Sequence, residues 1–117
     1  MQEPDFATVT SREQAEELFR QDLLERLFLL PVEFGGQDVP ENFVYVPTGF
    51  VEIKRSLDNN IIKPLMDEGK IRIYQAIPEY QGDSFIPIAI TISASGPAKF
   101  SSRIDIWGDA LGLQPVQ

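Results

Sequence analysis

The sequence predicts an α+β domain in which an antiparallel β-meander, at about residues 71–107, is packed on one face by helices near residues 11–27 and 48–69. Branched apolar residues alternate with small or polar ones through 71–77, 86–92 and 100–106, which is the period of a strand with one buried face. The other two stretches repeat apolar residues every three or four positions, as amphipathic helices do. A length of 117 residues suits one core, so we predict a single domain, 1–117, with loosely held ends at 1–9 and 108–117.

The first helix is predicted from its start signal. Thr10 is followed three residues later by Glu13, and Ser11 by Gln14, so either register makes a capping box. The apolar positions that follow extend the predicted helix to about Leu27; they are Ala15, Leu18, Phe19, Leu23 and Leu27.

Two short extended segments are expected next. Residues 28–31 are apolar up to a proline and predict a buried strand or extended segment, and the Gly35-Gly36 pair predicts a turn. Residues 43–46 are rich in β-formers and predict a second strand, which Pro47 ends.

The second helix is expected to begin after Thr48 as its cap and to end at Gly69. Pro64 would clash with the carbonyl four residues earlier, so we predict a kink or a restart near Asn59-Asn60. The predicted buried stripe consists of Phe50, Ile53, Leu57, Ile61 and Leu65.

The hairpin at 71–95 is the centre of the predicted core. Its arms are joined by a polar loop, 78–84, with turn-forming Gly, Asp and Ser residues. We predict that Ile73, Ile88 and Ile90 are buried against Ile53, Leu57 and Ile61.

Charge limits the class of partner. The formal net charge is −8, and residues 1–47 hold ten acidic and three basic side chains. A field of this sign repels nucleic acid and favours a basic protein partner. The longest apolar runs fall short of the ~20 residues that span a bilayer, so no membrane is expected. An acidic N-terminus and the absence of cysteine predict a cytoplasmic protein.

The residue types present argue against catalysis. The chain has no histidine, which removes the usual general base and the commonest transition-metal ligand. We therefore predict no enzymatic activity, no metal and no cofactor. Tyr80 lies in the loop between Pro78 and Pro87. The two prolines leave it little conformational entropy to lose on binding, which favours a role in contacts with a partner. The predicted partner-binding residues are Glu79, Tyr80, Asp83, Ser84 and Trp107.

An ordered series of short motifs carries a resemblance. It comprises Pro31, Phe34-Gly35-Gly36, Glu41-Asn42-Phe43-Val44, Val46-Pro47, Glu68-Gly69-Lys70, Pro78-x-Tyr80-x-Gly82-x-Ser84 and Pro87. From about Leu27 to Ile92 the chain resembles the later part of the DNA/RNA non-specific endonuclease domains of bacterial polymorphic toxins, which have a ββα-metal core. That resemblance puts Phe28 where those domains have their catalytic histidine, and Val32 and Glu33 where they have basic residues. It therefore implies a relative without the nuclease site; convergence on the same frame is the alternative.

Two classes of function follow from these observations. The first is a non-catalytic, acidic protein-binding domain, most concretely an immunity-type protein that masks a basic toxin. The second is a small structural or regulatory domain that self-associates through its sheet, as a homodimer, with Phe100 and Trp107 at the apolar edge.

Overall fold

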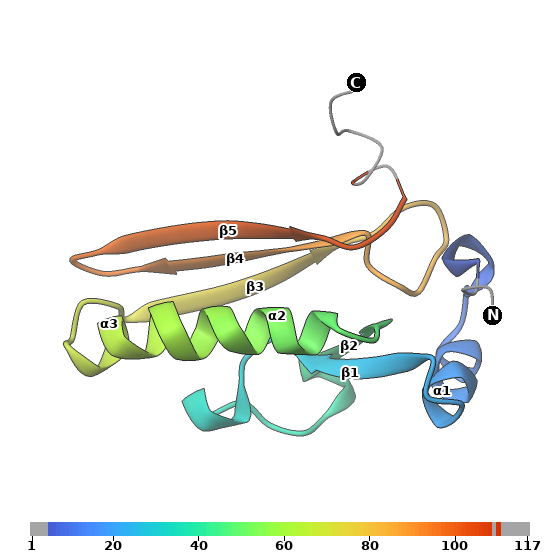
Figure 1. Cartoon of the computed structure of the whole chain (residues 1–117), viewed down its shortest axis with the longest axis horizontal. Helices are drawn as coiled ribbons and strands as arrows, with labels where there is room; N and C mark the ends of the chain where they lie inside the picture. The colour runs from blue at the N-terminus through green and yellow to red at the C-terminus, as the bar shows by residue number, and fades with distance from the viewer. Residues whose placement is uncertain (1–4, 109, 111–117) are drawn as a thin grey trace.

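The structure is a computed structural model that describes residues 5–108 and 110. It has an α+β fold with two antiparallel sheets, one of two strands and one of three. Figure 1 shows that the long helical segment and the β1–β2 hairpin lie on the same side of the three-stranded sheet. No helix or strand of the described residues covers the opposite side of that sheet. The sheet therefore has one buried face and one open face.

Helix α1 (Arg12–Arg20) follows a short 3-10 turn, η1 (Phe6–Thr8), and ends earlier than predicted. The Ser11 hydroxyl caps it by accepting from Gln14 N–H at 3.2 Å, as the capping-box pattern predicted. It stops at residue 20 because Asp22 adopts the left-handed conformation, with φ 62°. Leu23 N–H then donates to the Leu18 carbonyl at 2.9 Å, which is the Schellman ending of a helix.

Residues 24–28 form a strand and not the last turns of a helix. Strand β1 (Leu24–Phe28) pairs antiparallel with β2 (Phe43–Pro47), with Arg26 opposite Tyr45. The strand expected at 28–31 is thus four residues earlier, while the strand predicted at 43–46 is confirmed. α1 packs on this hairpin through Leu18 and Phe19.

The second helical segment consists of α2 (Phe50–Leu57), a π-helical stretch η4 (Asp58–Ile62) and α3 (Lys63–Asp67). Gly49 and not Thr48 occupies the N-cap position. The predicted restart at 59–60 takes the form of the π-helix, and Gly69 ends the segment with φ 74° as expected. The buried positions differ from the predicted stripe, because Lys54, Asp58 and Ile62 are buried while Ile53 and Ile61 are exposed.

Strands β3 (Ile73–Glu79), β4 (Ala89–Ser95) and β5 (Lys99–Asp105) form the predicted meander in the order β3-β4-β5. On β4, Ile90 and Ile92 are fully buried, and Ile88 is buried just before the strand. On β3 the predicted face is reversed: Ile73 and Ile77 are 59% and 52% exposed, while Tyr74 and Ala76 pack against the core. The outward residues Ile73 and Ile77 lie opposite Ser95 and Thr91 of β4.

Three apolar clusters hold the two layers together. The central one joins the hairpin to the sheet, with Leu27, Val44 and Val46 packed against Ile90, Ile92, Ile104 and Ile106. A second, around Ile62, Ile71 and Ala94, joins the helical segment to the far end of the sheet. A third lies between α1, the hairpin and Ile86, and it includes Phe6 and Val9, so residues 5–9 are anchored and not loosely held. The predicted loose end at 108–117 falls mostly outside the described residues.

No helix among the described residues combines the length and the apolar character needed to cross a bilayer.

Candidate functional site

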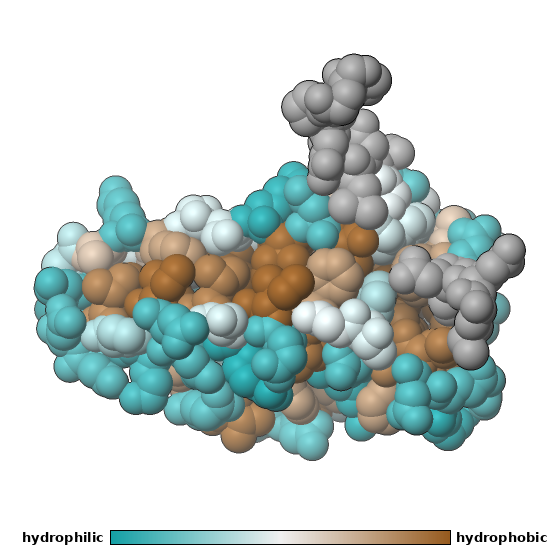
Figure 2. Space-filling view, viewed as in Figure 1, coloured by the Kyte–Doolittle hydropathy of each residue, from teal (hydrophilic) through white to brown (hydrophobic). Residues whose placement is uncertain are grey.

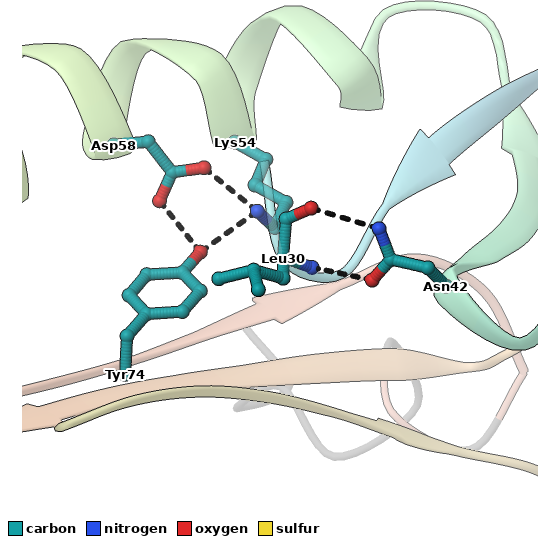
Figure 3. Close-up of polar contacts among 5 residues, drawn as sticks. All are labelled: Leu30, Asn42, Lys54, Asp58 and Tyr74. Atoms are coloured by element: carbon teal, nitrogen blue, oxygen red, sulfur yellow. Dashed lines mark hydrogen bonds and ion pairs between the residues drawn. The ribbon is translucent and has the colours of Figure 1, made fainter. Parts of the chain in front are cut away.

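Three polar side chains interact inside the apolar core, between α2 and β3 (Figure 3). Lys54 Nζ donates to Asp58 Oδ2 at 2.7 Å and to Tyr74 Oη at 2.8 Å. Tyr74 Oη in turn donates to Asp58 Oδ1 at 2.7 Å. The Lys54 and Asp58 side chains are only 3% and 4% exposed. We call these three residues the polar cluster.

Burial shifts the pKa values of two members of the polar cluster. Loss of hydration lowers the pKa of Lys54, and the hydrogen bond and charge of Asp58 oppose that decrease. Loss of hydration also raises the pKa of Tyr74, and here Asp58 adds to the increase because its carboxylate accepts a hydrogen bond from the phenol and its charge disfavours the phenolate. The arrangement therefore keeps the tyrosine protonated as a donor.

A pocket of about 230 Å³ adjoins the polar cluster. It is smaller than the ~300–1,000 Å³ typical of sites for drug-sized ligands. Its charged lining residues are Arg26, Lys54, Arg55, Glu33 and Asp58, and its apolar walls come from Leu27, Phe28, Pro31, Val32 and Val51. The lining thus holds three cationic and two acidic side chains, although the net charge of the whole chain is −8.

The pocket rim, η2 (Val32–Phe34), is fixed by contacts within the loop that joins β1 to β2. The Asn42 side chain accepts from Leu30 N–H and donates to the Leu30 carbonyl, each at 2.9 Å (Figure 3). Gly36 lies so close to the Leu30 carbonyl that any Cβ at this position would overlap its oxygen. Gly36 and Asn42 therefore have a structural role, which explains two of the short motifs in the sequence.

This pocket is lined by Phe28, Val32 and Glu33, among others. These are the positions at which the resemblance would place a catalytic histidine and basic residues. Among the described residues, no group of three or more acidic side chains is placed to hold a metal ion. The pocket lining instead combines cationic donors with apolar walls.

The predicted partner-binding residues lie in two different environments. Glu79 and Asp83 are exposed, and Glu79 pairs with Arg103 at 3.4 Å. Tyr80 is 49% exposed, and partial burial raises its pKa while Arg12 opposes that increase. These three residues belong to one surface loop and the strand end before it.

Ser84 and Trp107 are structural residues in this fold. The Ser84 hydroxyl is buried, donates to the Phe6 carbonyl at 2.7 Å and accepts from Ile86 N–H at 3.1 Å. Trp107 Nε1 donates to the Ile86 carbonyl at 3.1 Å, and its ring packs on Phe6. Both side chains anchor the 80–88 loop; Ser84 is buried and Trp107 is half-buried, and their part in binding stays a prediction.

The open side of the sheet carries exposed apolar residues that the sequence assigned to the core. Ile73 and Ile77 project from β3, which is an edge strand, and Tyr80 follows it. On the other side of the sheet, Ile53 and Ile61 of the helical segment are 48% and 38% exposed. Figure 2 shows an apolar band in the region between this helical segment and the sheet. Phe100 is half-buried and packs toward the core.

The polar cluster was not predicted from the sequence. Lys54 and Asp58 have the i, i+4 spacing of an ordinary surface ion pair on a helix, and Tyr74 alternates with isoleucines that seemed better core residues. Arg26 lay within a predicted helix. No feature of the sequence alone separates these residues from solvated ones.

The chain was compared with family models, curated proteins and solved structures, and none of the three comparisons finds a match. The endonuclease resemblance therefore rests on the short motifs alone.

Proposed function

We propose that this chain is a non-catalytic domain that binds a basic protein through strand β3 and the open face beside it. The observation that carries the proposal is the exposure of Ile73 and Ile77, at 59% and 52%, on one face of an edge strand. Branched apolar residues in strands usually face the core. Two that are exposed on the same face of β3 therefore favour a contact surface.

The edge itself supports binding by strand addition. β3 pairs with β4 on one side and, among the described strands, with none on the other. An unpaired edge offers backbone N–H and C=O groups to an incoming strand, and exposed side chains give that strand a surface to pack on. Pro78 lies near the end of β3 and lacks an N–H group, which limits pairing to the residues before it.

Charge supports a basic partner over a second copy of the chain. Two copies that each carry −8 repel one another, whereas a basic protein is attracted and its association is accelerated. An immunity-type protein that masks a basic toxin is the specific form of this function that we favour.

Absence of catalysis is part of the proposal. The sequence has no histidine or cysteine, and the buried lysine, aspartate and tyrosine donate to and accept from one another. We therefore propose that these three groups stabilise the core and do not transfer protons to a substrate.

Self-association through the sheet is the second candidate. It is favoured by the free edges of both β3 and β5 among the described strands. Sedimentation of the purified chain separates the two candidates, because the first predicts a monomer up to high concentration. A dimer that Ile73→Glu dissociates would support the second candidate and contradict the first.

Site-specific photo-crosslinking tests the proposed surface. A photoreactive amino acid replaces Gln75, which is exposed between the two isoleucines, and a matched control replaces Glu52, which is exposed on α2. We expect a crosslink to a basic protein in the source cell from position 75 and not from position 52. Equal crosslinking from both positions, or crosslinking from position 52 alone, would contradict the proposal.

A further inference from the structure

We propose that the pocket beside the polar cluster binds a small organic carboxylate. This site is separate from the β3 surface and does not depend on the proposed function. The pocket has a volume of about 230 Å³, and its lining combines hydrogen-bond donors with apolar walls.

The first argument is a buried donor without an acceptor. Arg26 Nε is buried and has no hydrogen-bond partner within the described part of the chain. No ion pair among the described residues includes this guanidinium, which lies 4.3 Å and 4.9 Å from the ring centres of Phe19 and Phe43. A buried donor without an acceptor costs free energy, and Arg26 is one of the residues that line the pocket, so a bound acceptor that reaches Nε would be stabilised.

The second argument is an excess of cationic donors. An ammonium group has three N–H donors, and the contacts of Lys54 within the described chain use two of them. Arg55 adds an exposed guanidinium to the same lining, and this group also pairs with Glu52. Asp58 pairs with Lys54 and Glu52 with Arg55, so among the described residues Arg26 is the one cation of the lining without an ion pair, and the pocket suits a monoanion better than a dianion.

The π-helical turn gives a third, independent reason to treat this as a binding site. Asp58 begins the π-helix η4, and π-helical turns inside α-helices occur frequently at functional sites. A buried ion pair contributes little net stability compared with apolar residues of the same size. Stability alone is therefore a weak reason for the polar cluster to be present.

The apolar walls determine the class of anion. The apolar walls would contact the uncharged part of a ligand and not its charged group; they consist of Leu27, Phe28, Pro31, Val32 and Val51. Inorganic phosphate has no apolar body, whereas a short aliphatic or aromatic acid has one. Arginine forms bidentate hydrogen bonds with carboxylates, which suits this lining.

Titration with benzoate, followed by amide chemical shifts, tests the proposal. Benzamide is the neutral control of the same shape, and inorganic phosphate is the control without an apolar body. We expect benzoate to shift amides at 26–33 and 51–58, with an affinity at least tenfold above that of benzamide or phosphate. Equal affinity for benzoate and benzamide, tighter binding of phosphate, or shifts spread over exposed cations elsewhere would overturn the proposal.

Two variants with a conserved fold, as judged by circular dichroism, sharpen the test. Arg26→Gln removes the unpaired cation and should weaken benzoate binding at least tenfold. Lys63→Gln removes an exposed cation of α3 and should leave the affinity unchanged. An unchanged affinity in the Arg26 variant would contradict the assignment. If that variant does not fold, the comparison of benzoate with benzamide on the native chain still decides the question.

Discussion

At the scale of single residues, Lys54 and Asp58 depend on one another because both side chains are almost fully buried. Removing one partner of a buried ion pair leaves the other charge uncompensated, whereas replacing all members by apolar groups is often neutral. Tyr74 shares this dependence, since its hydroxyl contacts both charged groups.

Substitution of Asp58 by Ala should therefore lower the free energy of unfolding by about 3–5 kcal/mol. The triple variant Lys54→Met, Asp58→Leu, Tyr74→Phe should recover most of that loss, because it leaves no unpaired charge in the core. Urea denaturation measures both effects. A loss below about 1 kcal/mol for the single variant would be typical of a surface position and would contradict the burial of the pair.

The raised pKa of Tyr74 predicts a loss of stability in alkali. Below the unfolded-state value of 10.0 the hydroxyl is protonated in both states, so its contribution is fully present. Above that pH the unfolded chain releases the proton while the folded chain retains it, so the free energy of unfolding falls with pH. The lowered pKa of Lys54 acts in the opposite direction. The free energy of unfolding rises with pH between the folded-state pKa of Lys54 and its unfolded-state pKa of 10.5.

A comparison with Tyr74→Phe isolates the tyrosine contribution. Between pH 10 and pH 11.5 the native chain should lose stability more steeply than the variant, as measured by urea denaturation at each pH. Parallel pH profiles would show that Tyr74 ionises as freely in the folded chain as in the unfolded one.

At the scale of secondary-structure elements, the orientation of β3 separates the predicted fold from the observed one. Ile90 is fully buried on β4, whereas Ile73 is 59% exposed on β3. Truncation of Ile90 to Ala should cost about 2–5 kcal/mol, as for other buried large-to-small changes. Truncation of Ile73 to Ala should stay within about 0.5 kcal/mol. Equal losses at the two positions would mean that both faces of the sheet are covered.

Local signals predicted the elements that short-range chemistry decides. The Ser11–Gln14 cap, the Gly69 ending, the interruption of the second helix and the β4–β5 faces all follow from residues close together in the sequence. The end of α1 does not, because Leu23 and Leu27 suit the buried face of a helix as well as that of a strand. Pairing with β2, fifteen or more residues away, decides between them.

The candidate site was less predictable than the fold, because it depends on contacts between distant elements. Tyr74 faces inward because Lys54 and Asp58 meet its hydroxyl there, and this compensates for exposing two isoleucines on the same strand. The loop residues Glu79, Tyr80 and Asp83 were predicted at the surface and lie there. Their role in binding stays a prediction.

At the scale of the whole molecule, charge and the residues of the pocket predict no hydrolysis of nucleic acids. A net charge of −8 repels phosphate backbones, and Phe28 occupies the position that the resemblance gives to a catalytic histidine. Incubation with plasmid DNA and RNA in Mg²⁺ or Mn²⁺ should leave both substrates intact. Cleavage that follows the protein through successive purification steps would contradict this prediction.

The most direct test of the β3 surface compares two pairs of exposed isoleucines by quantitative co-purification from the source cell. Ile73 and Ile77 lie on the open face of β3, while Ile53 and Ile61 lie on the helical segment. We predict that the double change of Ile73 and Ile77 to Ser removes a basic partner that the native chain retains, and that the same change at Ile53 and Ile61 does not. Retention of that partner by the β3 variant, or its loss only from the helical variant, would contradict the proposed surface.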